Sequence, residues 1–419
     1  MGKAVQPGIK ERYHVRRVLT SIVIAAAAST LLVACGDSGD SSSSTGSSSK
    51  EKGPITLGFA IGKTGFMDAY DGPPFTAAQL AVADINAKGG VDGRPLKIVS
   101  ADSKSKPDLA GDAATQVLSQ GADVVVTSCD FDQGSPAAIL ATGKGKLAFS
   151  TCAASTAFGP QGIGPLAYTM ATAASAEGAT MAEWATKEKK AKTAYVLLDD
   201  TIEFTKQSAY GFTERWKQLG NTLVGQDTFK QEDPSIDAQI TRLKGLATKP
   251  DVIFLTSYMP GEAKALKQLR AAGIDTPILA DEDVDGDFWK DAVPDISDVY
   301  YTTYVSIYGD DPDKKVNDLV TRFVKETSKK PDNGLFLTGY ATVQAIAKAI
   351  ELAGGSTDGS ALAAKLDTFE DEPLLLPTTF TKDLHITTDR TERVMEIKDG
   401  KSSFVQNWKP TQVPIPPSK

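Results

Sequence analysis

The stretch that most limits how this chain can fold is residues 55–102, where a β-rich run, a helical segment and a second β-rich run follow one another. The two runs are residues 55–60 and 96–101, and Gly89-Gly90 ends the helical segment between them, as glycines often do. Two strands joined by a helix form a parallel pair with a right-handed crossover. The loop after the first strand then lies at the carboxyl edge of the sheet, where α/β folds bind ligands.

The same alternation of short β-rich runs and helical segments continues along the chain. It is typical of doubly wound α/β domains, in which helices cover a mainly parallel sheet. We expect two such α/β series, the second starting after residue 172. The expected strands are residues 123–127, 147–150, 193–198, 223–229, 251–256 and 277–280, with β-rich pieces over 378–408. The expected helices are residues 108–119, 135–142, 176–190, 204–219, 236–246, 262–272, 313–328 and 335–352.

The N-terminus has the parts of a secretory signal. Arg16-Arg17 precede an apolar run over residues 18–34, and small residues precede Cys35. Leu32-Val33-Ala34-Cys35 resembles a lipobox, in which the cysteine thiol is acylated and becomes the first residue of the mature chain. We therefore expect a lipoprotein signal peptide over residues 1–34 and lipidation at Cys35. The alternative is an uncleaved membrane anchor, for which 17 residues are at the lower limit. A second hypothesis places the true translation start at Val15.

Residues 35–53 are rich in Ser, Gly and Asp and have hardly an apolar side chain. Such a segment cannot bury enough surface to fold, so we expect a flexible tether. Eighteen residues of this composition reach on the order of 23 Å. That reach would keep the folded part of the chain close to the membrane.

Composition and charge exclude several classes of protein. The 41% hydrophobic and 23% charged residues are typical of a globular protein. Cleavage before Cys35 would leave 419 − 34 = 385 residues, a length that favours two domains. It would also remove a net charge of +4 and shift the formal charge from −8 to −12. An acidic chain argues against nucleic acid and anionic lipid headgroups as partners.

Two cysteines remain after Cys35, namely Cys129 and Cys152, and each follows an expected strand. An even pair in an exported chain favours a disulfide, and neighbouring strand ends could bring the two together. Closing this loop would contribute roughly 3 kcal/mol in the chain-entropy model. The alternative is two free, buried thiols.

The ordered motifs of the chain resemble those of a known family. They are the loop of residues 65–71, the helix end at residues 83–90 and the sequence Val91-Asp92-Gly93-Arg94-Pro95-Leu96. They resemble ABC-transporter substrate-binding proteins of the branched-chain amino-acid (leucine/isoleucine/valine) type, which have the type I periplasmic binding protein fold. The resemblance reaches about residue 408. It implies two interleaved, doubly wound α/β lobes joined by a three-crossing hinge. Lobe 1 would comprise residues 54–171 plus 305–380 and lobe 2 residues 172–304 plus 381–409, followed by a C-terminal tail, 410–419.

The resemblance also implies which residues bind the ligand. Glu282 matches a carboxylate that pairs with a ligand α-ammonium, and a buried ammonium does need a charged partner. Ala153 and Ser155 match residues that hold a ligand carboxylate. Tyr70 and Tyr258 match aromatic residues of the two lobes. The remaining matches are Phe204, where the family often has Tyr, and Phe336, a looser side-chain contact.

One departure from the family pattern concerns the ligand. Where the family typically has Ser or Thr, this chain has Cys129-Asp130-Phe131-Asp132. Two carboxylates would repel an amino-acid carboxylate if both pointed into the site. Either they face solvent or cap the next helix, or the ligand is an amide, a polyamine or another cationic solute.

Catalytic and metal-binding motifs are incomplete. Gly62-Lys63-Thr64 lacks the spacing of a phosphate loop, and the acidic run that begins at Asp281 would need a glutamate where Ala292 stands to bind calcium. His385 is the one histidine after residue 34, and no nucleophile elbow accompanies it. We expect no enzyme activity, no cofactor and no metal.

The sequence as a whole predicts a lipid-anchored solute receptor on the extracytoplasmic face of a cell membrane. It would be a monomer that captures an amino acid, or an amide or cationic solute, between its lobes and delivers it to ABC permease subunits. The alternative is a sensory ligand-binding module that signals through a membrane partner.

Overall fold

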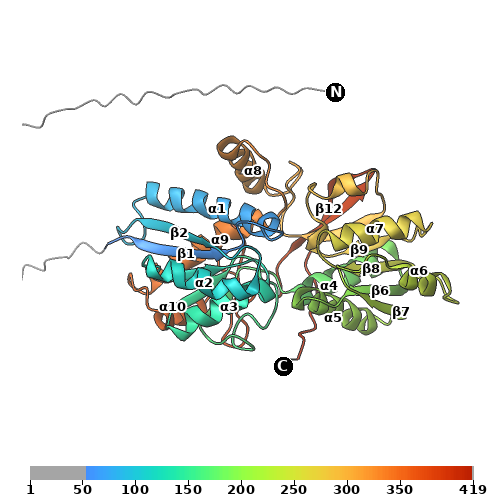
Figure 1. Ribbon diagram of the computed structural model, residues 1–419, viewed down its shortest axis with the longest axis horizontal. Helices are drawn as coiled ribbons and strands as arrows, with labels where there is room; N and C mark the ends of the chain where they lie inside the picture. Colours follow the sequence, from blue (N-terminus) through green and yellow to red (C-terminus); the bar gives the residue numbers. More distant parts are fainter. Residues whose placement is uncertain (1–52, 418–419) are drawn as a thin grey trace, which may run out of the picture. The chain divides into compact units, whose positions relative to one another are not determined.

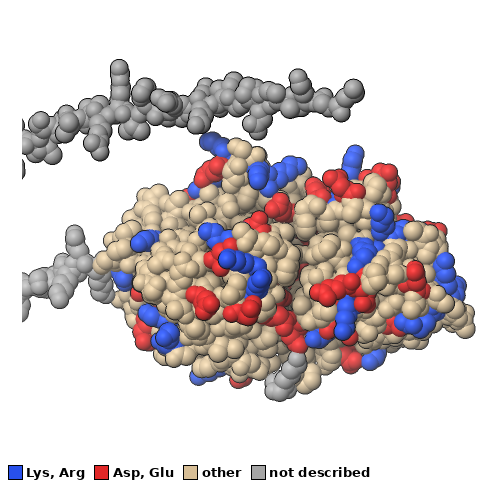
Figure 2. Space-filling view, viewed as in Figure 1, with Lys and Arg blue, Asp and Glu red and all other residues tan. Residues whose placement is uncertain are grey.

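The computed structural model describes residues 53–417, in which the strands form two separate sheets covered by helices (Figure 1). The predictions for the signal peptide, for Cys35 and for almost all of the tether lie outside these residues. No helix within 53–417 is long and apolar enough to cross a membrane. Acidic and basic side chains are interspersed on the face shown in Figure 2.

The first sheet is parallel throughout, in the order β2-β1-β3-β4-β5. The chain runs outward from β1 in both directions, which places a ligand-binding crevice at the carboxyl ends of β1 and β3. β1, β3 and β4 are buried along their whole length, because helices cover both faces of a parallel sheet. The strands are β1 (Ile55–Ile61), β2 (Leu96–Asp102), β3 (Val124–Thr127), β4 (Leu147–Ser150) and β5 (Ala167–Thr169).

Helices from two distant parts of the chain cover this sheet. α9 packs against α1 in Figure 1, and Gly339 makes this close crossing possible. A Cβ there would lie 1.8 Å from the carbonyl oxygen of Pro74. α8 and α10 contribute apolar side chains to the same core. These helices are α1 (Asp68–Ala87), α2 (Pro107–Ser119), α3 (Phe131–Gly143), α8 (Lys314–Thr327), α9 (Phe336–Leu352) and α10 (Gly359–Leu366).

The second sheet has the order β12-β11-β10-β9-β8-β6-β7. β11 runs antiparallel to both of its neighbours, β10 and β12. Its strands are β6 (Thr193–Asp199), β7 (Thr222–Phe229), β8 (Val252–Thr256), β9 (Ile278–Ala280), β10 (Val299–Thr303), β11 (Glu392–Lys398) and β12 (Lys401–Trp408). Its helices are α4 (Ala174–Trp184), α5 (Glu203–Gln218), α6 (Asp237–Lys244) and α7 (Gly261–Ala271). All of α4 is buried, because it packs against α5, β9 and β10.

The chain passes between the two sheets three times: after β5, after β10 and before β11. The three passages touch one another. Thr172 forms a parallel bridge with Thr387, and its N–H donates to the Tyr304 hydroxyl. The Arg390 guanidinium donates to the Met170 carbonyl and to the Thr172 hydroxyl. The α/β fold with interleaved halves and three crossings is therefore as expected, whereas the exact lobe boundaries stay a prediction.

Some element boundaries were predicted wrongly. α1 begins at Asp68, inside the expected loop, and α3 begins at Phe131 because Asp130 serves as its N-cap. The helix expected to reach residue 190 ends as an α-helix at Trp184 and continues as a π-helical turn. The β-rich piece that was expected from residue 378 forms strands only from Glu392 onward, since the segment before it crosses between the sheets. β5, β10 and α10 were missed.

Candidate ligand-binding site

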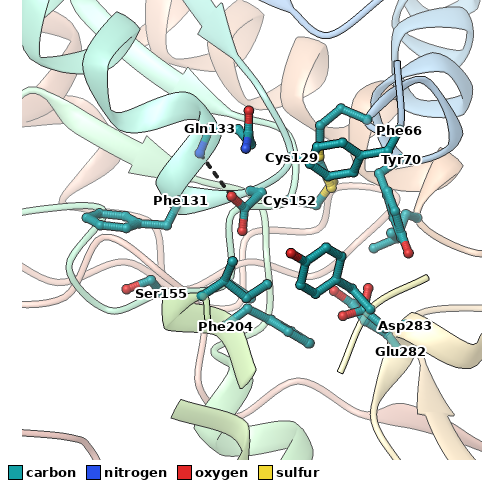
Figure 3. A pocket seen from close by; sticks show the side chains of 16 residues that line it. Phe66, Tyr70, Cys129, Phe131, Gln133, Cys152, Ser155, Phe204, Glu282 and Asp283 are labelled. Carbon is teal, nitrogen blue, oxygen red and sulfur yellow. Dashed lines mark hydrogen bonds between the residues drawn. A yellow bond between two sulfur atoms is a disulfide. The ribbon is translucent and has the colours of Figure 1, made fainter. Parts of the chain in front are cut away.

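A cavity of about 60 Å³ lies between the two halves, and both contribute to its wall (Figure 3). The lining residues are Phe66, Met67, Tyr70, Cys129, Asp130, Phe131, Gln133, Cys152, Ala154, Ser155, Ile202, Phe204, Tyr258, Glu282, Asp283 and Leu335.

The disulfide predicted from the sequence is present and forms part of the wall. Cys129 and Cys152 follow β3 and β4, which are neighbours in the first sheet. Their Cα atoms lie 4.4 Å apart, and their sulfur atoms are bonded. The bridge therefore ties together two loops at the carboxyl edge of the first sheet.

Asp71, which the sequence did not single out, holds these loops in place. Its carboxylate is buried and accepts hydrogen bonds from the N–H groups of Gly62 and Cys129 and from the Ser128 hydroxyl. Burial raises the pKa of Asp71 to about 6, although the hydrogen bonds oppose this. The residue connects the first turn of α1 with the ends of β1 and β3.

Asp130 has two roles in the structure. It caps α3 by accepting a hydrogen bond of 2.9 Å from the Gln133 N–H, the dashed line in Figure 3, and it also lines the cavity. Burial, and next the carboxylate of Asp132, raise the pKa of Asp130 to about 7. Of the alternatives that the sequence left open, helix capping and a place in the site are both realised for Asp130.

The second half contributes two adjacent carboxylates. Glu282 and Asp283 follow β9 in a 3₁₀ turn and are 5% and 8% exposed. No described residue donates a hydrogen bond to Oε2 of Glu282. Burial, and next the carboxylate of Asp283, raise the pKa of Glu282 well above its usual range. Burial also raises the pKa of Asp283, and Asp281 and Asp130 raise it further.

Hydrogen bonds connect the two halves around the cavity. The Met259 N–H donates to the Tyr70 hydroxyl at 3.1 Å, and the Glu203 N–H, at the start of α5, donates to Asp132 at 2.9 Å. The Gln207 side chain donates to the Ser155 hydroxyl at 2.8 Å. These contacts close the cavity on several sides.

The structure brings most of the predicted site residues together. Tyr70, Ser155, Phe204, Tyr258 and Glu282 all line the cavity. Two predicted residues do not.

Ala153 lies in the core, and its N–H already donates to the Ser150 hydroxyl, while Ala154 lines the cavity. Phe336 is also a core residue, packed against Phe323, while Leu335 lines the cavity. In each case the residue that lines the cavity is one position away. Asp283 and Gln133 were missed.

The lining is aromatic and acidic. Its charged members are three carboxylates, and it has no Lys, Arg or His. His385 lies elsewhere, stacked on Tyr168 with 3.7 Å between ring centroids. Within residues 53–417 no group of three or more His, Cys, Asp or Glu is placed to hold a metal ion. The arrangement is suited to holding a small amine against carboxylates and aromatic faces.

A solute cavity between two α/β halves joined by three crossings defines a class of protein, the two-lobed solute-binding proteins. The chain matches the periplasmic binding protein family over residues 54–402 and belongs to that family. The resemblance stated from the sequence is thereby confirmed, and with it the expectation of a binding protein rather than an enzyme.

Individual relatives are distant. The Leu/Ile/Val-binding protein of Citrobacter freundii is 24% identical over 283 residues, which cover 68% of this chain and 75% of the relative. The substrate-binding protein LivJ of Streptococcus pneumoniae, solved with isoleucine, superposes with a TM-score of 0.74 at 24% identity and covers 85% of this chain and 100% of its own. A solute-binding protein of Rhodopseudomonas palustris BisB5, solved with 3,4-dihydroxybenzoic acid, superposes with a TM-score of 0.70 at 18% identity. The match covers 86% of this chain and 99% of the relative.

Proposed function

We propose that this chain is the lipid-anchored, extracytoplasmic receptor of an ABC importer and that it captures a small amine-bearing solute between its two lobes. The observation that carries the proposal is the buried Glu282 carboxylate in a cavity between the halves, with one oxygen that accepts no hydrogen bond from the described residues. A ligand ammonium would supply the missing donor.

The anchor rests on the N-terminal sequence. The charged flank, the apolar run and Leu32-Val33-Ala34-Cys35 support lipidation at Cys35 after removal of residues 1–34. A Ser/Gly-rich tether up to residue 53 would let the two lobes reach a permease nearby.

Capture would couple to closure. Tyr70, Asp130 and Ser155 come from the first half, whereas Phe204, Tyr258 and Glu282 come from the second. A ligand touches both sets only when the halves are together, so it shifts the population toward the closed form. The hydrogen bonds that the N–H groups of Met259 and Glu203 donate across the cleft would stabilise the closed form only.

Relatives indicate that the fold accepts different solutes. The S. pneumoniae relative was solved with isoleucine and the R. palustris relative with 3,4-dihydroxybenzoic acid. An amino acid fits the role proposed for Glu282, which would hold its ammonium. The site chemistry, and not the fold, must therefore decide the ligand.

Thermal unfolding against a panel of solutes tests the proposal. The chain without residues 1–53 is mixed with amino acids, amides, short amines and aromatic acids. A ligand at 100 times its Kd adds about 2.7 kcal/mol of stability and raises the melting temperature. A panel without any hit would contradict solute capture by this cavity. A sensory receptor would also bind a solute, but solute uptake by cells would then not depend on the chain.

A further inference from the structure

The cavity wall is rich in carboxyl groups and has no cationic side chain. The carboxyls belong to Asp130, Glu282 and Asp283, and Oε1 of Gln133 and Oε2 of Glu282 are buried without a donor among the described residues. The other polar side-chain groups are the Gln133 amide nitrogen and the hydroxyls of Tyr70, Ser155 and Tyr258. A cationic solute would supply donors to these oxygens and favour the ionised form of the carboxyls, whose pKa values are raised in the ligand-free cavity.

The carboxylates come from both halves of the molecule. Asp130 stands at the N-terminus of α3, while Glu282 and Asp283 follow β9. Asp130 and Asp283 are close enough for the charge of one to raise the pKa of the other. A single ammonium on Glu282 would leave Asp130 uncompensated on the opposite side of the cavity.

An α-amino acid matches this wall poorly. The carboxylate of the amino acid would be placed near Ser155 and Asp130. There it could accept a hydrogen bond from the Ser155 hydroxyl but would be repelled by the carboxylate of Asp130. The Ser155 hydroxyl already accepts hydrogen bonds from Gln207 and from the Ala157 N–H, which leaves its single proton for a ligand. No Lys, Arg or His of the lining is available to pair with a carboxylate.

We infer that the ligand is a short organic diamine without a carboxylate, with one ammonium on Glu282 and Asp283 and the other on Asp130. This assignment of the solute class rests on the proposed function. The side chains of Phe66, Phe131 and Phe204 line the cavity and provide apolar surface for the methylene groups (Figure 3).

The experiment compares matched amines on the full chain purified in detergent. The probes are diamines with three to six carbons, the monoamines of the same length, leucinamide and leucine, and Kd is measured by calorimetry. The best diamine should bind at least tenfold more tightly than its monoamine, and leucinamide at least tenfold more tightly than leucine. Leucine that binds more tightly than every diamine would overturn the inference and leave solute capture standing.

Substitutions at Asp130 make the test specific. Asn and Ser are both good N-caps, so D130N and D130S keep the start of α3. D130N should raise the Kd of the best diamine at least thirtyfold and that of the monoamine less than threefold. Asp112→Asn, which removes an exposed charge on α2, is the control and should change neither. Equal losses for diamine and monoamine in D130N would refute the placement of the second ammonium.

Failure of the inference and failure of the proposed function give different results. A hit confined to neutral amino acids or aromatic acids overturns the diamine assignment only. Absence of binding by every probe, charged or neutral, overturns both. In D130S the repelling carboxylate is replaced by a donor, so leucine should bind more tightly than it binds the unmodified chain, and an unchanged leucine Kd would count against the inference.

Discussion

The substitution Glu282→Gln should weaken the binding of amines and stabilise the ligand-free fold at the same time. Glu282 is 5% exposed, and no described residue donates to its Oε2 atom. The substitution removes the charged partner of a ligand ammonium, so the binding free energy of an amine should weaken by at least about 2 kcal/mol, or roughly thirtyfold in Kd. In the absence of ligand, burial raises the pKa of Glu282, so the folded chain must take up a proton at neutral pH, and the neutral amide removes this cost. It can also donate to neighbouring carboxylates, so the gain in stability should be about 1–3 kcal/mol.

Two measurements on one variant follow from this reasoning. Calorimetry with leucinamide and 1,4-diaminobutane gives the loss in affinity. Thermal unfolding of the ligand-free chain at pH 7.5 should show a rise of roughly 1–4 °C, from an unfolding entropy of about 2.1 cal/mol/K per residue.

Glu262→Gln is the matched control for this variant. Glu262 is also buried, and neither of its carboxylate oxygens has a partner among the described residues, but it does not line the cavity. Glu262→Gln should therefore stabilise the fold and leave the Kd of the amines within about twofold of that of the unmodified chain. An unchanged amine affinity in Glu282→Gln would remove Glu282 from the site, and a lowered melting temperature would refute the claim that its charge is uncompensated.

Three further outcomes are expected. Thiol titration of the unfolded, non-reduced chain should detect neither Cys129 nor Cys152, and two reactive thiols would contradict the bridge. Cys129→Ser should lower stability by about 3 kcal/mol in the chain-entropy model. Several buried carboxyls have a raised pKa in the fold, chiefly through burial: about 6 for Asp71 and Asp281 and about 7 for Asp130 and Glu392. The folded chain then holds more protons than the unfolded chain between about pH 4 and 7, so its stability falls as the pH rises through this window. The ligand-free melting temperature should thus be higher at pH 5 than at pH 8, and the reverse order would show that these carboxyls are compensated. Cys35→Ser should release the chain from the membrane fraction and abolish labelling with a fatty acid. If the variant stays in the membrane fraction with residues 1–34 attached, the result would support the uncleaved anchor instead.

The sequence predicted the frame of the fold because each buried strand is an uninterrupted β-rich run beside an amphipathic helix. Its errors fall where local pattern has little information. β5 has three residues, too few for a period. α1 includes Pro73 and Pro74 beyond its first turn, where a proline removes an intrahelical hydrogen bond and disfavours a helix, so the sequence there resembled a loop.

The predicted ligand-binding residues stay a prediction, although most of them line one cavity. Ala154 lines the cavity instead of Ala153, and Leu335 instead of Phe336, because the direction of a side chain after β4 or at the N-cap of α9 depends on the local turn and not on spacing. The acidic run after β9 contained Asp283, but only the 3₁₀ turn shows that it faces the cavity together with Glu282. That Asp130 both caps α3 and lines the cavity requires the relative placement of the two halves, which no local pattern specifies.

The same carboxylates should govern the movement of the two halves. Asp130 belongs to the first half and Asp283 to the second, and the charge of Asp130 raises the pKa of Asp283, so closure without a cation brings like charges together. A diamine converts this repulsion into attraction on both sides. Protonation relieves it too, since the pKa of Asp130 is raised to about 7, with Asp71, Asp132 and Asp283 as its acidic neighbours and the Gln133 N–H opposing the shift.

We therefore expect the ligand-free chain to be more closed at pH 5 than at pH 8. Small-angle scattering should give a smaller radius of gyration at the lower pH, and a diamine at pH 8 should reproduce that value. D130N should remove much of the pH dependence, whereas the surface variant Asp112→Asn should retain it. If the radius is the same at both pH values in the unmodified chain, repulsion across the cleft does not hold the lobes apart. Closure would then depend on ligand contacts such as those of Tyr70 and Tyr258.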